Sequence, residues 1–360
     1  MKPFRPGFIY IDEKSLNDSI TERVLERFSS VPYEVISGTT HLPDQLKRRE
    51  ESTVTSGKRT LYLRHNQGKF VERCPGTANS HICCNYHVAN IAVNCHLDCT
   101  YCFLQSYLTE RAITVNTNVQ DFLAEIDEMT ALHQGKELRI GTGELADSLA
   151  LDELTGFSTY LVPFFAERRN VLLELKTKGN FVDNLLTMDP KGNSVIAWSL
   201  NTPDIIKAEE FKCSILEQRL EAAVKCRDAG YKLAFHFDPL IIHDNYEIKY
   251  REVVEMLFDY VGAGSIRWIS LGVLRFTSSG KAAIEARFPN SKIVYGEMIA
   301  GADGKMRYLQ PVRVDIYRKM VSWIRSRDET PFIYLCMESP AVWNRVFGVN
   351  HAAREAVALF

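Results

Sequence analysis

Short apolar runs alternate with amphipathic stretches along most of this chain, beginning near residue 89. A short apolar run bounded by turn residues is typical of a buried strand, and apolar residues three or four positions apart are typical of a helix. The pattern predicts strands over 89–93, 138–141, 171–176, 194–201, 232–237 and 266–274. It predicts helices over 119–133, 151–168, 182–188, 216–229, 246–261 and 279–287. This alternation indicates a parallel sheet with right-handed crossovers.

The segments before and after this region have a different character. The N-terminal segment contains one helical pattern and two strand patterns, the last with the alternation of an edge strand, over 15–28, 33–37 and 58–65. The C-terminal segment predicts a hairpin that turns at 301–304, a helix, a strand and a final helix, over 291–307, 315–325, 331–336 and 340–347. We therefore expect an N-terminal α/β extension, a central β/α region, and a C-terminal hairpin, helix and strand that close it, over 1–88, 89–290 and 291–360.

Composition and charge limit the classes of partner. The hydrophobic content of 46% and the charged content of 24% are ordinary for a globular protein. The formal net charge is −2, so any nucleic-acid site has to be a local patch. Nine cysteines in a chain of this length argue against a disulfide scaffold. No apolar run has the length of a membrane span and the first residues lack the apolar segment of a signal peptide, so we expect a cytoplasmic protein with no membrane partner.

Three of the cysteines form one compact motif. Cys95, Cys99 and Cys102 follow a C-x3-C-x2-C spacing, with Tyr101 directly before the last of them. Three thiolates on so short a loop can face one metal centre, and cysteine thiolates hold iron–sulfur clusters. The alternatives are a structural zinc site or three core cysteines. A zinc site usually has two C-x-x-C knuckles or added histidines, and no second knuckle exists here, because Cys83 and Cys84 are adjacent. The spacing therefore favours a 4Fe–4S cluster with one iron left open for a small molecule.

The motif resembles that of the radical S-adenosylmethionine (SAM) superfamily, whose members carry the same spacing with an aromatic residue before the third cysteine. The resemblance implies an α/β fold with a partial (β/α)6 TIM-like barrel, whose active site lies at the C-terminal ends of the strands. It also implies two cofactors, the 4Fe–4S cluster and SAM, with SAM bound to the open iron and cleaved reductively to a 5′-deoxyadenosyl radical. The implied partner is an external electron donor of the flavodoxin or ferredoxin type.

Polar residues follow successive predicted strands. Gly143 and Glu144 follow the second strand, where a glycine lets a ligand approach the backbone and a carboxylate can accept from an amino group. Lys176 can bind a carboxylate, and the hydroxyl of Ser199 and the amide of Asn201 suit ribose or methionine contacts. Taken singly, each of these residues is typical of an ordinary turn between a strand and a loop. Because they follow successive strands downstream of the cysteine motif, together they predict a ligand site. The candidate SAM contacts are Tyr101, Gly143, Glu144, Lys176, Ser199, Asn201 and Asp238.

Longer stretches resemble one branch of this superfamily, the spore photoproduct lyase family. The resembling stretches are 95–104, 175–176, 198–201, 219–224, 229–231, 238–250 and 275–277. The resemblance implies a DNA-repair lyase that acts on the 5-thyminyl-5,6-dihydrothymine lesion. By position, it assigns the cluster ligands and the SAM site to Cys95, Cys99, Cys102, Tyr101, Lys176 and Ser199. Arg307 and Tyr308 resemble an Arg–Tyr pair used on the lesion DNA, and a guanidinium beside an aromatic ring suits a phosphate and a stacked base.

Two positions depart from that family. The family has a cysteine past the second strand that returns a hydrogen atom to the product radical, and Glu144 occupies the matching position in this chain. A tyrosine that follows the last cluster cysteine in the family is replaced by Phe103, which has no hydroxyl. Both changes affect the last step and leave radical generation intact. Cys336 is a candidate replacement donor, with a buried core cysteine as the alternative, and together with Tyr101 it completes the predicted catalytic residues.

Three functions follow from these patterns. The first is a radical SAM enzyme related to the lyase, acting on DNA or another nucleic acid. The second keeps the radical chemistry but acts on a peptide or a small metabolite, which the missing thiol and the near-neutral charge favour. The third is an iron–sulfur electron carrier or redox sensor without enzymatic activity, which has no use for the strand-end residues. The sequence leaves the oligomeric state open.

Overall fold

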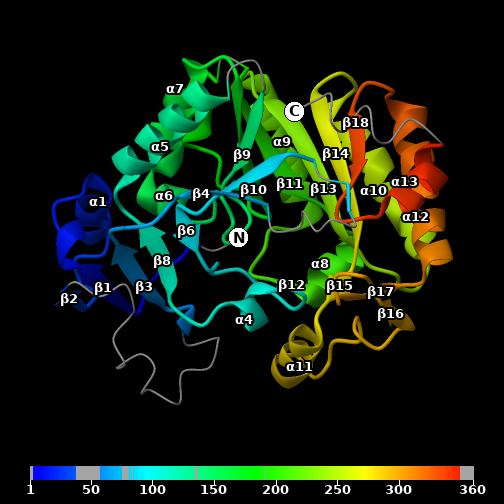
Figure 1. Cartoon of the computed structure of the whole chain (residues 1–360), viewed down its shortest axis with the longest axis horizontal. Coiled ribbons are helices and arrows are strands. Elements are labelled where there is room, and N and C mark those ends of the chain that lie inside the picture. The colour runs from blue at the N-terminus through cyan, green and yellow to red at the C-terminus, as the bar shows by residue number, and fades with distance from the viewer. Residues whose placement is uncertain are drawn as a thin grey trace.

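The computed structural model describes residues 3–37, 57–74, 81–82, 84–133, 137–190 and 192–348. An eight-stranded and a five-stranded sheet make up most of the described strands, and a two-stranded and a three-stranded sheet accompany them (Figure 1). The cysteine motif lies between β6 (Ala92–Val93), a strand of the five-stranded sheet, and the short helix α4 (Leu104–Tyr107). The five-stranded sheet therefore positions the start of the motif.

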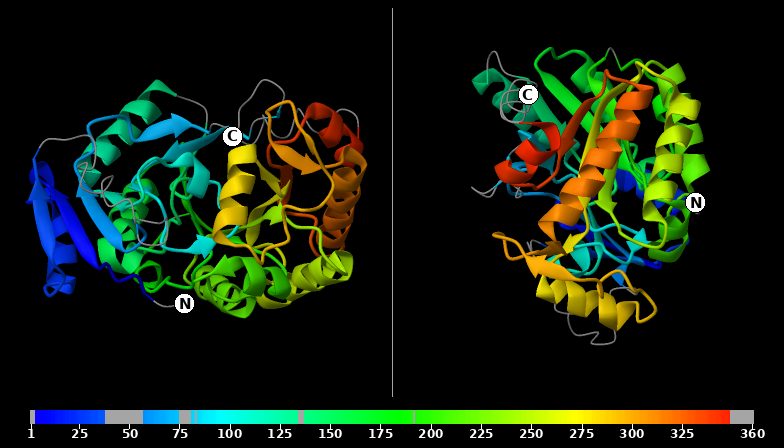
Figure 2. Two further views of the ribbon diagram at one scale, coloured as in Figure 1. Left: turned by 90° about the horizontal axis from the view of Figure 1, so that it is seen from below. Right: turned by 90° about the vertical axis from the view of Figure 1, so that its right-hand side faces the viewer.

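The eight-stranded sheet curls into a half-barrel with helices on its outer side (Figures 1 and 2). Its strand order is β18 (Phe332–Leu335), β14 (Ile266–Val273), β13 (Lys232–Leu240), β11 (Ser194–Ser199), β10 (Val171–Thr177), β9 (Leu138–Gly141), β5 (Tyr86–Ala89) and β4 (Val71–Arg73). Neighbouring strands from β18 to β5 run parallel, and β4 is antiparallel to β5. The carboxyl ends of the parallel strands therefore meet at one rim, where barrels of this class place their sites. The partial barrel implied by the sequence is confirmed.

Amphipathic helices cover the outside of the half-barrel. The helix α7 (Phe157–Ala166) contacts β10, α9 (Leu216–Asp228) contacts β11 and β13, and α10 (Tyr246–Val261) contacts both α9 and α12 (Gln310–Arg327). Each turns apolar residues inward at helical spacing, as α10 does with Val253, Val254 and Leu257. The helix predicted over 151–168 is divided at Gly156, whose φ is +64°, into α6 (Asp152–Thr155) and α7, while Pro163 lies inside α7. The helix predicted over 182–188 is a single turn, η2 (Leu185–Thr187).

The prediction was wrong for the first barrel strand. The apolar run 89–93 was expected to form it, but the strand beside β9 is β5, which ends at Ala89. Three residues later the chain enters the other sheet, where Ala92 and Val93 pair antiparallel with β8 (Ile113–Asn116). Four of the five residues in the run are apolar because the chain passes from one buried sheet to the next. The single polar residue, Asn90, does not distinguish this crossing from a continuous strand. The strand predicted over 331–336 is confirmed as β18, at the edge of the barrel sheet.

The five-stranded sheet has the order β2 (Tyr33–Ile36), β1 (Phe8–Asp12), β3 (Thr60–Arg64), β8 and β6. The strand β3 was expected at an edge, but β1 and β8, which the pattern did not predict, flank it and bury Leu61 and Leu63. The helix α1 (Ser19–Arg27) contacts α6, while α5 (Val119–Leu132) contacts α7. Because β6 and β8 come after residue 88, this sheet contains strands from both sides of the domain boundary predicted there. The domain boundaries at 88 and 290 stay predictions.

The C-terminal elements follow the prediction closely. The hairpin of β16 (Met298–Ala300) and β17 (Met306–Tyr308) turns at 301–304, with Gly304 at φ +73°, and β15 (Arg275–Phe276) adds a third strand. The helix α12 is longer than the predicted 315–325, and α13 (Pro340–Phe347) has the predicted bounds. A further helix, α11 (Ser278–Arg287), lies beside α4. Within the described part of the chain, no helix combines the length and the apolar character that crossing a bilayer requires.

A buried charged network fills the inside of the half-barrel. Arg139 on β9 donates to Glu174 on β10 at 2.7 Å, and its guanidinium lies 4.2 Å from the ring centre of Trp268. The other oxygen of Glu174 bonds the ring of His236 on β13 at 2.6 Å. Burial alone would raise the pKa of Glu174, but Arg139 and His236 hold it well below its usual range. The network links β9 to its neighbour β10 and reaches across β11 to β13.

Candidate active site at the carboxyl ends of the strands

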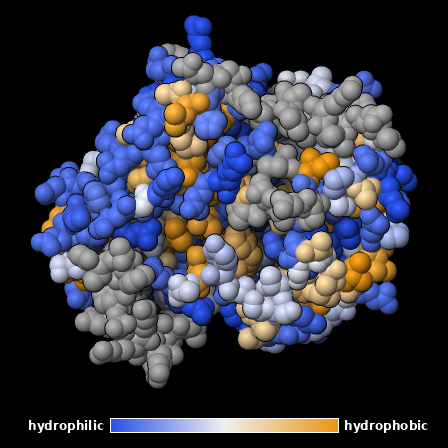
Figure 3. Space-filling view, in the orientation of Figure 1, coloured by the Kyte–Doolittle hydropathy of each residue, from blue (hydrophilic) through white to orange (hydrophobic). Residues whose placement is uncertain are grey.

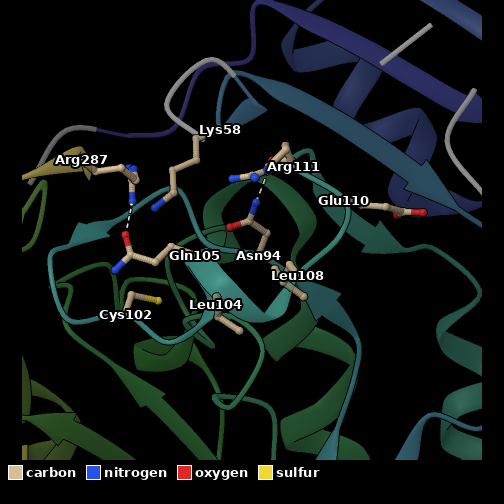
Figure 4. Close-up of a pocket in the computed structure, with 9 residues that line it drawn as sticks. All are labelled: Lys58, Asn94, Cys102, Leu104, Gln105, Leu108, Glu110, Arg111 and Arg287. Carbon is tan, nitrogen blue, oxygen red and sulfur yellow. Dashed lines mark hydrogen bonds between the residues drawn. The ribbon is translucent and has the colours of Figure 1, made fainter. Parts of the chain in front are cut away.

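The three motif cysteines lie on one loop that is held at its start and in its middle. Asn94, at φ +71°, donates from its amide to the carbonyl of Arg111 at 2.8 Å and accepts from the backbone N–H of Cys95 at 2.8 Å. The middle of the loop forms β7 (Asp98–Cys99), which pairs antiparallel with β12 (Glu210–Phe211). The loop is thus anchored to the segment that follows β11, on the other side of the site. Figure 4 shows the Asn94 contact together with the basic side chains beside Cys102.

Basic side chains hold the outer side of this loop (Figure 4). Lys58 is buried and donates to the Leu97 carbonyl and, at 3.0 Å, to the Asp98 carboxylate. Arg287 from α11 donates to the same Asp98 oxygen at 2.8 Å and to Gln105 at 2.8 Å. The Asp98 carboxylate of the cysteine loop therefore accepts hydrogen bonds from both the N-terminal region, through Lys58, and the C-terminal side of the barrel, through Arg287. Neither cation was identified from sequence, because each acts across a long stretch of chain. The space-filling view in the orientation of Figure 1 shows polar side chains over most of the visible surface, with a group of apolar ones toward the middle (Figure 3).

The electrostatics of the three thiols differ. Burial raises the pKa of Cys95 to about 12, and it also raises the pKa of Cys102; the ammonium group of Lys58 acts against burial at both. At Cys99 a hydrogen bond with Cys213, whose sulfur is 3.6 Å away, lowers the pKa, against the effect of burial, and Lys178 lowers it further. One buried and two half-buried thiols with cations nearby fit a group that needs thiolate ligands and carries negative charge. Among the described residues, no three His, Cys, Asp or Glu side chains converge in the manner of a single-ion site.

The predicted residues Tyr101 and Ser199 are linked through a buried ion pair. The Tyr101 hydroxyl donates to Glu210, and the other oxygen of Glu210 accepts from Arg219. Arg219, from α9, also donates to the Ser199 carbonyl at 2.8 Å. Burial would raise the pKa of Glu210, but Arg219 and Lys178 hold it below its ordinary value. Sequence reasoning missed Glu210 and Arg219, since buried ion pairs are not encoded by local spacing.

The turn after β9 lies directly against the end of β10. A Cβ on Gly143 would be 2.8 Å from the Cβ of Lys176, so only glycine fits without a shift. Ser148 fastens the contact by accepting from the Lys176 N–H at 3.0 Å and by donating its own N–H to the Lys176 carbonyl at 3.0 Å. Glu144 is half-buried on the same turn. The structure therefore brings Gly143, Glu144 and Lys176 together, as predicted for neighbouring strand ends.

Asp238 and Cys336 meet at the far end of the rim. The two oxygens of Asp238 accept from Arg275 at 3.1 and 3.2 Å, and the same guanidinium donates to the Cys336 sulfur at 3.4 Å. Burial and the Asp238 carboxylate raise the pKa of Cys336 well above its ordinary value, so the thiol keeps its proton. Cys336 follows β18 directly and is half-buried at the strand ends. The role of Cys336 as a hydrogen donor stays a prediction, with a structural core cysteine as the alternative.

Three residues that were predicted to contact SAM or DNA form hydrogen bonds to other groups of the protein. The amide oxygen of Asn201 accepts from the Tyr250 hydroxyl at 2.7 Å, while its nitrogen donates to the Pro239 carbonyl at 3.0 Å. Arg307 pairs with Asp303, and the hydroxyl of Tyr308 accepts from the Ile242 N–H at 3.1 Å. Arg307 and Tyr308 are only 4% and 7% exposed, so as placed they present no open face to a base or a phosphate. Their roles stay predictions.

Comparison with known proteins bears on the same residues. The family model described as spore photoproduct lyase matches residues 4–312, which include the cysteine loop, the strand ends and the hairpin. The chain belongs to the spore photoproduct lyase family. It is 27% identical over 306 residues to the spore photoproduct lyase of Geobacillus sp. (strain Y412MC61), covering 81% of this chain and 85% of the relative. It is also 27% identical over 307 residues to that of Bacillus subtilis (strain 168), covering 82% and 86%.

Solved structures of the family show the same fold. A cysteine-to-alanine mutant of spore photoproduct lyase superposes with a TM-score of 0.83 at 23% identity, covering 93% of this chain and 100% of that one. Spore photoproduct lyase complexed with dinucleoside spore photoproduct gives a TM-score of 0.80 at 22% identity, with the same coverage. A mutant with bound AdoMet and dinucleoside spore photoproduct gives 0.78, again at 22% identity and the same coverage. The family match confirms the radical SAM membership that was inferred from the cysteine motif.

Proposed function

We propose that this chain is a radical SAM lyase that repairs the thymine lesion known as spore photoproduct in DNA. The observation that carries the proposal is the family match, which runs from the N-terminal sheet through the half-barrel to the hairpin. Relatives that match most of their length carry the lyase name, and neighbours of the same fold were solved with the lesion dinucleoside. The near-neutral charge of −2 makes the DNA contact local, at the rim of the barrel.

The cluster is assigned to Cys95, Cys99 and Cys102. When bound, a 4Fe–4S cluster supplies the electron that cleaves SAM to the 5′-deoxyadenosyl radical. The chain contributes three thiols on an anchored loop, and the cations Lys58 and Lys178 offset the negative charge that thiolate ligands bring. An external donor of the flavodoxin or ferredoxin type delivers the electron. Free thiols and an oxygen-sensitive group fit the reducing cytoplasm.

SAM is assigned to the rim between β9 and β13. Glu144 is assigned to accept from its amino group and Lys176 to bind its carboxylate. The close approach of the Gly143 turn to Lys176 on β10 supports the assignment. Tyr101 is fixed by Glu210 and, like Ser199, borders this region. The remaining assigned contacts are Asn201, through its unused N–H, and Asp238, through the face of its carboxylate not taken by Arg275.

Cys336 is assigned to the hydrogen-atom return that the family cysteine performs at the position of Glu144. A thiol S–H is weak enough to quench a carbon radical, whereas a carboxylic O–H is too strong. Burial and Asp238 keep Cys336 protonated, which is the form the step needs. Arg307 and Tyr308 are assigned to the lesion DNA, which requires the Asp303 pair to open when DNA binds.

The test uses anaerobically reconstituted, dithionite-reduced protein with SAM and the spore photoproduct dinucleotide. Both 5′-deoxyadenosine and the thymine product are quantified in one run, with Cys99→Ala as the control that removes a motif thiol. The proposal expects both products from the wild type and neither from the control. A wild type that yields neither contradicts it.

A second function keeps the radical chemistry but changes the substrate to a peptide or small metabolite. The observation in its favour is Glu144, which replaces the thiol that the family uses on the thymine radical. The same run separates the two. Production of 5′-deoxyadenosine without any thymine product favours the second function.

A further inference from the structure

A fourth cysteine contacts the motif. Cys213 lies just past β12, the strand that pairs with β7, and its sulfur is 3.6 Å from the sulfur of Cys99. It is half-buried, and the carbonyl of Phe211 at 3.7 Å is its other polar neighbour. The contact joins two segments that are 114 residues apart in the chain, so it results from the fold and not from the local spacing of the motif.

The geometry limits what Cys213 can do. A disulfide requires the sulfurs at about 2.05 Å, much closer than they lie in this structure. A cysteine-bound 4Fe–4S cluster places each cysteine on its own iron, and a thiolate this close to Cys99 would have to share the iron that Cys99 holds. A hydrogen bond is the remaining interaction. A Cys99 sulfur that is bound to iron has no proton, so the S–H of Cys213 has to be the donor.

We propose that Cys213 is a positioning residue that donates an S–H···S hydrogen bond to the Cys99 thiolate and thereby raises the reduction potential of the cluster. A thiolate is a stronger acceptor than the Phe211 carbonyl, so the S–H turns toward Cys99 when iron is bound. Hydrogen bonds to ligand sulfurs stabilise the reduced, more negative cluster and are one of the factors that set its potential. The effect makes electron transfer from the external donor easier. The inference rests on the cluster proposed above.

The test is a redox titration of the reconstituted holoenzyme, followed by electron paramagnetic resonance of the reduced cluster. Cys213→Ala removes the donor, and Cys213→Ser keeps a donor of similar size. Cys226→Ala, in the buried core of α9, controls for loss of a thiol elsewhere. We expect a lower midpoint potential for Cys213→Ala, a potential near that of the wild type for Cys213→Ser, and no change for Cys226→Ala.

Iron and sulfide content is measured first, so that two failures stay distinct. A wild type without a cluster contradicts the proposed function, whereas an intact cluster with the same potential in Cys213→Ala and wild type overturns this inference alone. Loss of iron or a changed cluster type in Cys213→Ala also overturns it, because Cys213 would then be a ligand. The second readout is the coupling of an exchangeable proton to the reduced cluster, observed by electron paramagnetic resonance. Transfer to D2O should remove one such coupling in the wild type and in Cys213→Ser. Cys213→Ala should lack this coupling before the transfer.

Discussion

Arg219→Met tests the buried ion pair that fixes Tyr101. Arg219 and Glu210 have side chains that are 0% and 1% exposed, so removing the guanidinium leaves a carboxylate inside the protein without its main partner. The variant also loses the bonds of Arg219 to the carbonyls of Ser214 and Ser199. Breaking a buried pair on one side costs about 3–5 kcal/mol, and the two lost bonds place the expected cost at the upper end of that range.

The measurement is the free energy of unfolding of the cluster-free protein from urea titration. Arg251→Met is the control, because Arg251 pairs with Glu255 on the surface, where the two side chains are 62% and 45% exposed, and such pairs contribute at most about 1 kcal/mol. Adding Glu210→Gln to Arg219→Met should restore part of the stability, since no unpaired charge then remains. A loss below about 1 kcal/mol for Arg219→Met, or a double variant less stable than the single one, would refute the reasoning.

Three further predictions concern the site and the barrel interior. Cys336→Ser should leave 5′-deoxyadenosine formation intact but lower the thymine product about tenfold or more, measured by chromatography of both products; equal yields would return Cys336 to a structural role. Gly143→Ala should weaken SAM binding measured by equilibrium dialysis, because its Cβ would lie 2.8 Å from the Cβ of Lys176; unchanged affinity would contradict the assigned SAM position. Glu174 has a folded pKa below its usual value, so its contribution to stability is present above pH ~4.5 and is lost as the pH falls below that value. Acid unfolding of Glu174→Gln should therefore depend less on pH than that of the wild type, and parallel curves would show that Glu174 is not the group responsible.

Local pattern predicted the parallel strands and the C-terminal hairpin because each buried strand has its own apolar run and turn residues. It failed where two sheets exchange chain, since Ala89 and Ala92 are both buried although they belong to different sheets. It also missed β1, whose burial depends on a partner, β3, that lies far along the chain.

The candidate site divides in the same way. The spacing of the three cysteines and the glycine turn at Gly143 are local, and the sequence indicated both. The contacts of Lys58 with Asp98, of Tyr101 with Glu210 and of Cys99 with Cys213 join residues 40, 109 and 114 positions apart. No periodicity encodes such pairs, because each is created by the folding of separate segments onto one loop.

The measurement that tests the central claim most directly is the conversion of spore photoproduct back to two thymine residues in an oligonucleotide carrying one lesion, with reduced holoenzyme and SAM. An undamaged oligonucleotide of the same sequence and the Cys99→Ala variant are run beside it. The account predicts repaired DNA from the wild type with the lesion strand alone. Steady 5′-deoxyadenosine formation that is equal with damaged and undamaged DNA, and without repair, would contradict it.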